Sequence, residues 1–186
     1  MIYRYEIEVG TTELASTFLD RICKLHNDTF SVEPFEWVDS MAQEHQELLT
    51  GLLENPTFAL AVARRGDELL GFAYGHQLLA DHGWWGDFLI PVLPDIKAEW
   101  TGRTFALITL AVESHARGGG LGRTLVDQLF ASRTEERGLL SVQPNATDTQ
   151  AFYVHTGWQL IGRKGPLDGV TPSCWDIYSR PIQLNA

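Results

Sequence analysis

Hydrophobic positions along the chain change their spacing several times, and each change predicts a new element. Residues 3–8 alternate polar and apolar side chains, which is typical of a half-buried strand. After residues 11–12, two threonines that can cap a helix, apolar side chains recur every three or four positions. The same helical spacing returns from about Asp39 and ends at residues 55–56, Asn-Pro. The pattern therefore predicts a strand followed by two helices.

Strand-like patterns dominate the rest of the chain. Residues 57–64 and 68–78 flank the tripeptide RGD, as the two strands of a hairpin do. Residues 104–112 (TFALITLAV) form a nearly uninterrupted apolar run, which is typical of a central strand buried on both faces. Residues 122–137 have helical spacing. The remaining predicted elements are a strand at 139–143, a short helix capped by Thr147 or Asp148 and ended by Gly157, and strands at 158–163 and 173–180.

One long stretch fits neither period. Residues 79–102 (LADHGWWGDFLIPVLPDIKAEWTG) are rich in Gly, Pro and Trp. A loop of this length is uncommon in a compact domain and usually serves function. No internal repeat or linker divides the chain, so we expect one domain over residues 1–186. The mixed order of strands and helices predicts an α/β (α+β) fold around one sheet.

The composition suits a folded domain in a reducing compartment. Of the 186 residues, 44% are hydrophobic, which is enough for a substantial core. The two cysteines, Cys23 and Cys174, are too few for a disulfide framework and lack the spacing of a metal site. The sequence has no apolar signal region, and no apolar run approaches the roughly 20 residues that cross a bilayer. We therefore expect a cytoplasmic protein with no membrane contact and no metal.

Charge is spread unevenly along the chain, whose formal net charge is −10. Residues 1–100 carry 17 acidic and 6 basic side chains, a net charge of −11, whereas residues 101–186 carry 7 acidic and 8 basic ones, a net charge of +1. The acidic balance argues against nucleic acid, which needs a basic face. Either the acidic half is simply a solvated surface, or it meets a cationic ligand while the second half binds an anionic one.

Residues 111–125 (AVESHARGGGLGRTL) place three consecutive glycines between the apolar strand and the next helix. Free N–H groups and the positive end of the helix dipole favour an anion at such a junction, and glycine lets the backbone come close to it. A flexible turn is the alternative. Neither common nucleotide motif fits: a P-loop would need glycine at Arg117, and a dinucleotide fingerprint would need glycine at Arg123.

The pattern that does fit is Arg-x-x-Gly-x-Gly, formed by Arg117, Gly120 and Gly122. It resembles the coenzyme-A-binding loop of the GCN5-related N-acetyltransferase (GNAT) family. Downstream, residues 142–158 (VQPNATDTQAFYVHTGW) resemble that family's segment in which an Asn precedes a short helix ending in Phe-Tyr-x-x-x-Gly-aromatic. The two motifs occur in the family's order and separation, and together they cover residues 104–163.

The resemblance implies a mixed sheet of about six or seven strands, splayed between the fourth and fifth and flanked by about four helices. It also implies acetyl-CoA as co-substrate and no metal. The pantetheine arm would pair with the backbone of Leu110, Ala111 and Val112. Asn145 would contact the same arm, although a helix-entry turn would also explain this residue. The pyrophosphate would be held by the loop residues Arg117, Gly118, Gly119, Gly120, Leu121, Gly122 and Arg123.

The resemblance makes Tyr153 the candidate catalytic acid. A tyrosine hydroxyl, with a reference pKa of about 10, stays protonated at neutral pH and can protonate a leaving thiolate. Packing on a short helix is the alternative explanation for this residue. A backbone N–H near Ala111 or Val112 would stabilise the developing oxyanion.

The sequence does not identify the residue that acts as general base. Many relatives carry an acidic residue on the central strand, where this sequence has Thr109, which cannot act as a base. A water relay or an amine that arrives neutral is an alternative to a side chain. The other side chains considered are Glu36, His76, Asp87, Glu113 and His115.

The acceptor is expected on the side of the first two helices and the long loop. Clustered aromatics and carboxylates in these regions suit a small cationic or aromatic primary amine, although tryptophans also pack cores. A protein N-terminus or lysine is a second candidate acceptor, and a non-catalytic acyl-CoA sensor is a third function. Dimers are common in the family, so a homodimer is compatible with the resemblance. The candidate substrate-binding residues are Glu36, Trp37, Trp84, Trp85 and Asp87.

Overall fold

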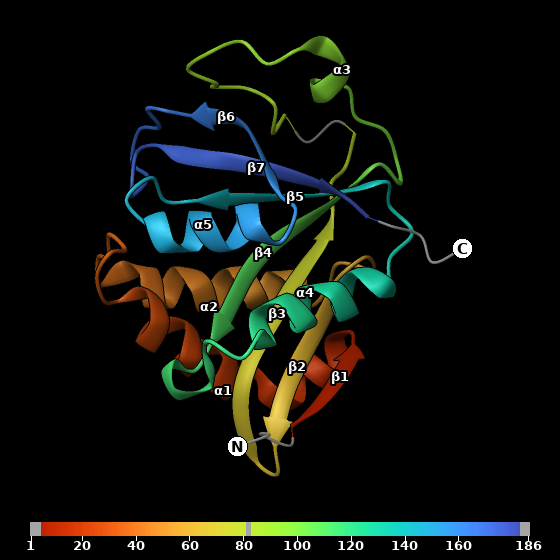
Figure 1. Cartoon of the computed structure of the whole chain (residues 1–186), viewed down its shortest axis with the longest axis vertical. Helices are drawn as coiled ribbons and strands as arrows, with labels where there is room; N and C mark the ends of the chain where they lie inside the picture. Colours follow the sequence, from red (N-terminus) through yellow and green to blue (C-terminus); the bar gives the residue numbers. More distant parts are fainter. Residues whose placement is uncertain (1–4, 81–82, 183–186) are drawn as a thin grey trace.

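The computed structural model describes residues 5–80 and 83–182, which form one seven-stranded sheet with helices on both faces (Figure 1). The strands are β1 (Glu6–Gly10), β2 (Ala59–Arg65), β3 (Glu68–Gln77), β4 (Thr104–Val112), β5 (Arg137–Val142), β6 (Gln159–Lys164) and β7 (Trp175–Pro181). The helices are α1 (Thr12–Phe30), α2 (Ser40–Leu52), α3 (Pro94–Lys97), α4 (Leu121–Ala131) and α5 (Thr147–His155), with a 3-10 turn η1 at Ser114–Ala116.

The strand order across the sheet is β1-β2-β3-β4-β5-β7-β6, and only β4 and β5 run parallel. That parallel pair is short, because it extends only from Thr104 opposite Arg137 to Ala106 opposite Leu139. Beyond Ala106, the two strands diverge, whereas β4 stays paired with β3 up to Val112. The sheet is therefore splayed between its fourth and fifth strands, as expected.

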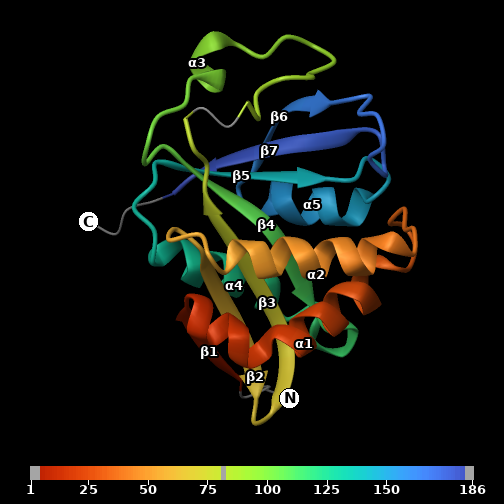
Figure 2. The same cartoon turned by 180° about the vertical axis from the view of Figure 1, so that it is seen from behind.

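Helices cover the two faces of the sheet in separate layers. α1 and α2 lie on one face, seen from behind in Figure 2, while α4 and α5 lie on the other (Figures 1 and 2). Apolar stripes explain this arrangement, because Ile22 of α1 and Leu49 of α2 are buried against strand residues such as Phe72. On the opposite face, Leu125 of α4 and Tyr153 of α5 share a second apolar cluster.

The long loop between β3 and β4, over its described residues 83–103, reaches the β6 end of the sheet (Figures 1 and 2). It contains one short helix, α3, which the sequence did not predict; its first residue is Pro94, a residue that fits the first turn of a helix. A third apolar cluster fixes the loop to the sheet by packing Trp84, Trp85 and Phe88 against Leu139 of β5 and Ile177 of β7.

Two sequence predictions need correction. The helix expected over 122–137 ends at Ala131, because residues 133–136 leave the helix and run alongside the chain at Gly102. The short helix α5 begins after Ala146 without any side-chain cap from Thr147 or Asp148. The start of the first predicted strand, at residue 3, lies outside the described residues. In the described part of the chain, no helix has the length and apolar character that crossing a membrane requires.

Candidate active site

The glycine loop leaves a row of backbone donors free. Gly118 and Gly120 both have positive φ, +80° and +81°, and Gly120 directly precedes α4. Within residues 5–80 and 83–182, none of the six amide N–H groups from Gly118 to Arg123 donates to an acceptor. Free amides at a helix start, aided by the helix dipole, form a ready site for a phosphate or diphosphate.

The glycines also keep this site open. A Cβ atom built on Gly118, Gly119 or Gly120 would meet nothing within 4 Å, so space lies in front of the loop. Gly122 differs, because its Cβ would lie 3.4 Å from the ring of Phe152 in α5 and 3.6 Å from Val112. The first three glycines therefore leave room for a ligand, while the fourth lets α4 approach α5 and the end of β4.

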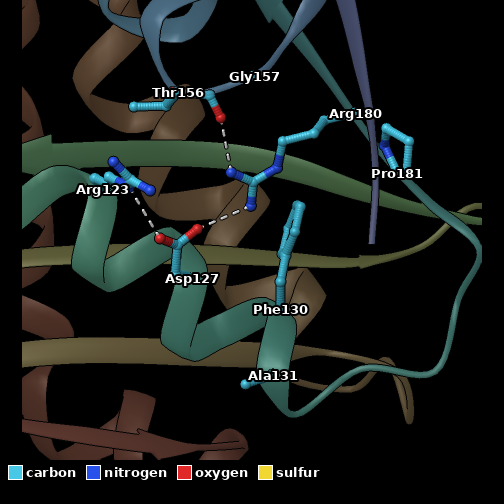
Figure 3. Close-up of a pocket in the computed structure, with 8 residues that line it drawn as sticks. All are labelled: Arg123, Asp127, Phe130, Ala131, Thr156, Gly157, Arg180 and Pro181. Atoms are coloured by element: carbon cyan, nitrogen blue, oxygen red, sulfur yellow. Dashed lines mark hydrogen bonds and ion pairs between the residues drawn. The ribbon is translucent and has the colours of Figure 1, made fainter. Parts of the chain in front are cut away.

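The two arginines predicted to meet phosphate both point to protein groups. Arg117 Nε donates to the Val112 carbonyl at 2.8 Å, which turns this side chain back toward β4. Arg123 Nε lies 3.3 Å from Asp127 Oδ2, and Asp127 Oδ1 also accepts from Arg180 at 3.1 Å (Figure 3). Arg123, Asp127 and Arg180 line a pocket between α4 and the turn after α5, shown in Figure 3. Direct contact of either arginine with phosphate stays a prediction.

The free edge of β4 offers a second set of backbone groups. Glu113 N–H donates to Leu70 O at 2.9 Å, and the register places Phe72 opposite Ala111. Because bonding alternates along an antiparallel pair, Ala111 bonds to β3, whereas Leu110 and Val112 direct their N–H groups into the gap between β4 and β5. The Leu110 carbonyl points the same way, while the Val112 carbonyl accepts from Arg117. Of the two N–H groups named from the sequence, that of Ala111 is thus directed to β3 and that of Val112 to the gap, as is that of Leu110; an oxyanion-stabilising role stays a prediction.

Tyr153 of α5 is buried in the apolar cluster against which Leu110 and Val112 of β4 also pack. Its ring packs 5.7 Å from Trp158 and 5.1 Å from Phe152, measured between centroids. Its hydroxyl has no hydrogen-bond partner in the described chain, yet it is not among the fully buried unpaired polar atoms. Burial raises the pKa of the phenol above its usual value of 10, so the hydroxyl keeps its proton at neutral pH.

Two residues predicted for different ligands lie in contact. The Asn145 side-chain amide donates to Glu36 Oε1 at 3.3 Å, joining the loop after α1 to the entrance of α5. Gln143, which is buried, strengthens this link by accepting from Glu36 N–H at 2.7 Å and donating to Glu36 O at 3.3 Å. Trp37 follows in the same loop, 6.0 Å from the ring of His26. Glu36 is thus held beside the end of β5, where the gap opens.

Trp84, Trp85 and Asp87 lie together in the long loop between β3 and β4. Trp85 Nε1 donates to Glu99 Oε2 at 3.1 Å, and Lys164 Nζ lies 4.5 Å above the ring of Trp84. The Asp87 carbonyl accepts from Gly165 N–H at 2.8 Å. These contacts fix the loop to β6 and β7, so a packing role explains the tryptophans, and their contact with an acceptor stays a prediction.

The candidate bases are dispersed. His115 Nε2 pairs with Glu68 at 3.3 Å, and His76 Nδ1 lies 2.8 Å from the Gln77 carbonyl. Thr109 instead belongs to a buried chain with Tyr74 and His45, which sequence reasoning missed. These three residues come from α2, β3 and β4, so no single segment of the sequence carried a signal for the contact. Among the described residues, no three His, Cys, Asp or Glu side chains are grouped as a metal site would require.

Comparison with known proteins decides the family. The profile described as Acetyltransferase (GNAT) family matches residues 19–158, which is more than half of the chain. The chain belongs to the GNAT family of acetyltransferases. GNAT enzymes use acetyl-CoA, so the chain is an acyltransferase, and the free amides, the open glycines and the splayed strands fit that co-substrate. A comparison with curated protein sequences gives no match.

Solved structures share the GNAT fold over nearly the whole chain. Aminoglycoside 6'-acetyltransferase type Ii is 22% identical, with a TM-score of 0.63 and coverage of 97% of this chain and 99% of that one. An Escherichia coli N-acetyltransferase of a ribosomal-protein alanine is 15% identical, with a TM-score of 0.61 and coverage of 98% and 97%. The PaiA N-acetyltransferase of Thermoplasma acidophilum, in complex with coenzyme A, is 12% identical, with a TM-score of 0.59 and coverage of 96% and 99%.

Proposed function

We propose that the protein transfers an acetyl group from acetyl-CoA to a primary amine of a small, cationic or aromatic molecule. The observation that carries this proposal is the contact between Glu36 and Asn145. Asn145 belongs to the segment expected to touch the donor, and Glu36 belongs to the region expected to bind the acceptor. A carboxylate fixed beside the donor gap suits an ammonium group.

The donor would be held mainly by main-chain groups. The free N–H groups of residues 118–123 would bind the diphosphate. The Leu110 backbone groups and the Val112 N–H would hydrogen-bond the arm, as an added strand does. When bound, acetyl-CoA supplies the acetyl group as a thioester. The N–H groups that face the gap can then donate to the acyl oxygen.

Tyr153 would act as the acid. Its side chain comes from α5 and shares an apolar cluster with Leu110 and Val112 of β4, and its raised pKa keeps the proton on the hydroxyl oxygen. The same hydroxyl has no internal partner in the described chain, so no protein hydrogen bond has to break before it donates. Donation to the departing sulfur would speed the reaction by about 10²–10⁴-fold.

The acceptor region would select a cation by charge and an apolar body by aromatic contact. Glu36 supplies a carboxylate, and Trp37, half-buried in the next position, supplies an indole face. The net charge of −11 on residues 1–100 would also favour the approach of a cation.

Release of free thiol from acetyl-CoA in the presence of spermidine, glucosamine, tyramine and free amino acids tests the proposal. Turnover with at least one amine is expected, with mass spectrometry showing an added acetyl group on its nitrogen. Tight binding of coenzyme A without turnover on any amine would favour a non-catalytic sensor instead.

A protein acceptor is the second candidate. The long loop between β3 and β4 favours it, because its side chains Leu89, Ile90 and Leu93 are 51%, 76% and 68% exposed. Exposed apolar side chains that lie together often mark a surface that binds protein. Peptides with a free N-terminus or an internal lysine belong in the same assay. Faster turnover on a peptide than on every small amine would replace the first proposal with this one.

A further inference from the structure

A chain of hydrogen-bonded side chains crosses the core from β4 to the helices. Thr109 Oγ1 donates to the Tyr74 hydroxyl at 3.0 Å, and this hydroxyl lies 3.0 Å from His45 Nε2. His45 then stacks on His26, with ring centroids 3.5 Å apart and an interplanar angle of 8°. The chain links β4, β3, α2 and α1, four elements that are far apart in the sequence.

Burial makes this chain costly to maintain. Tyr74, His45 and Thr109 are 0%, 5% and 8% exposed, and His45 Nδ1 has no partner among the described residues. A buried polar group without a full set of hydrogen bonds destabilises a fold by about 1–3 kcal/mol, whereas apolar residues of similar size would not. A polar chain kept at such a cost calls for a role beyond packing.

Thr109, the first member of this hydrogen-bonded series, belongs to β4 beside the gap between β4 and β5. Pairing between β4 and β5 stops at Ala106, so Thr109 belongs to the part of β4 that has no partner on that side. The register with β3 shifts between Tyr74 and Gly75, which leaves Ile108 as an extra residue beside Thr109. Ile108, the neighbour of Thr109, is 37% exposed, so this part of β4 borders solvent.

The hydrogen bonds between these side chains fix which atom donates and which accepts at each step. Because the Tyr74 oxygen accepts from Thr109, the Tyr74 proton points to His45 Nε2, which must then be the unprotonated nitrogen. Among the described residues, none donates a hydrogen bond to the Thr109 hydroxyl oxygen. The rings that contact His45 are His26 from α1 and Tyr74 from β3.

We propose that the Thr109 hydroxyl oxygen accepts a hydrogen bond from the N–H of the acceptor amine, and that Tyr74 and His45 are positioning residues that hold this oxygen in the accepting orientation. The inference rests on the proposed function, because it needs an amine at the gap. Thr109 fixes the amine and does not take its proton. His45 does not take it either, since burial and His26 lower the pKa of the imidazole to about 3.

The test compares Thr109→Val, which keeps the shape of the side chain and removes the hydroxyl, with Thr109→Ser, which keeps the hydroxyl. Thr29→Val is the matched control, because Thr29 is also buried and its hydroxyl has no partner in the described chain. Each variant is assayed for thiol release with the best amine of the panel, and for slow hydrolysis of acetyl-CoA without amine. Coenzyme A affinity and thermal unfolding verify the fold.

For Thr109→Val we expect kcat with the amine to fall about 10-fold, the loss of one hydrogen bond, and to fall further than the rate of hydrolysis without amine. Thr109→Ser should restore most of the rate, and Thr29→Val should leave it unchanged. Equal kcat values for Thr109→Val and the wild type would overturn this inference and leave the proposed function standing. A wild-type protein that acetylates no amine would remove the proposed function together with the inference.

Tyr74→Phe separates positioning from packing. It frees the Thr109 hydroxyl to rotate, so kcat should fall about 3-fold, by less than in Thr109→Val. Because Tyr74 acts only through Thr109, the double variant Thr109→Val with Tyr74→Phe should match Thr109→Val alone. Independent losses that multiply in the double variant would contradict the positioning role.

Discussion

Asn145 and Glu36, which are 109 positions apart in the sequence, meet through a hydrogen bond of 3.3 Å at the entrance of α5. The contact joins the first half of the chain, which is acidic, to the second half, which carries the donor loop. Two further bonds between Gln143 and the backbone of Glu36 fix the loop at this point. The position of the Glu36 carboxylate is therefore set by the end of β5, and its charge can be tested separately from its position.

Glu36→Gln should weaken the binding of cationic amines. The amide keeps an oxygen that can accept from Asn145 but removes the negative charge. We expect KM for spermidine to rise about 3–10-fold at low salt and less at high salt, because salt screens an exposed charge. Coenzyme A affinity should stay the same. Glu44→Gln, an exposed change on α2, is the control, and an equal rise in KM there would indicate a general effect of net charge.

Gly120→Ala should weaken coenzyme A binding. The residue has a φ of +81°, and a side chain in this region costs about 1–2 kcal/mol. The strain should move the free amides of the loop and lower affinity by about 10-fold, measured by calorimetry. Gly66→Ala is the matched control, since Gly66 has a φ of +59° and an equally open surrounding in the β2–β3 turn. The control should lose stability and keep its affinity.

Tyr153→Phe should lower turnover by about 10²–10⁴-fold with coenzyme A affinity little changed. The free energy of unfolding should stay close to that of the wild type, because the hydroxyl has no partner in the described chain. Tyr178→Phe provides the contrast, since the Tyr178 hydroxyl donates to Gln150 at 3.2 Å. That variant should lose stability and retain turnover, and an unchanged rate in Tyr153→Phe would end its assignment as the acid.

Acid should destabilise the fold through His45. Burial lowers the pKa of this histidine to about 3, below the unfolded value of 6.5. Below pH 6.5 the unfolded chain therefore binds a proton that the folded chain excludes, so the contribution is present above pH 6.5 and lost as pH falls. Between pH 7 and pH 5 the loss is about 2 kcal/mol. Urea unfolding of wild type and His45→Gln should differ by this amount in their pH dependence; parallel curves would contradict it.

Local patterns predicted most helices and strands, because the spacing of apolar side chains within a short segment indicates which face of the element is buried. The run at 104–112 coincides with β4, and the hairpin around RGD coincides with β2 and β3. The end of α4 was missed because residues 132–137 (SRTEER) contain no glycine or proline that would end a helix, while long-range bonds to Gly102 and Arg103 draw the chain away. Such contacts have no local signal.

The donor site was more predictable than the acceptor site for the same reason. The loop and α5 carry their motifs in single short segments, so their residues could be named from the sequence. Tyr74, His45 and Thr109 come from different elements, and only the register of β3 with β4 brings the Tyr74 and Thr109 side chains together. Trp84 and Trp85 looked like a ligand surface, yet their neighbours Glu99 and Lys164 also give them a packing role.

The short, three-residue pairing of β4 with β5 also bears on how the protein can evolve, because main-chain groups and side chains would serve different substrates. The donor would be met by main-chain groups along β4 and the loop, which many side-chain replacements leave intact, whereas the acceptor would be met by side chains such as Glu36 and Trp37. Substitutions at a few acceptor positions can therefore redirect the enzyme to a new amine while the donor chemistry is retained. A fold organised in this way can diversify its substrates without first losing its reaction.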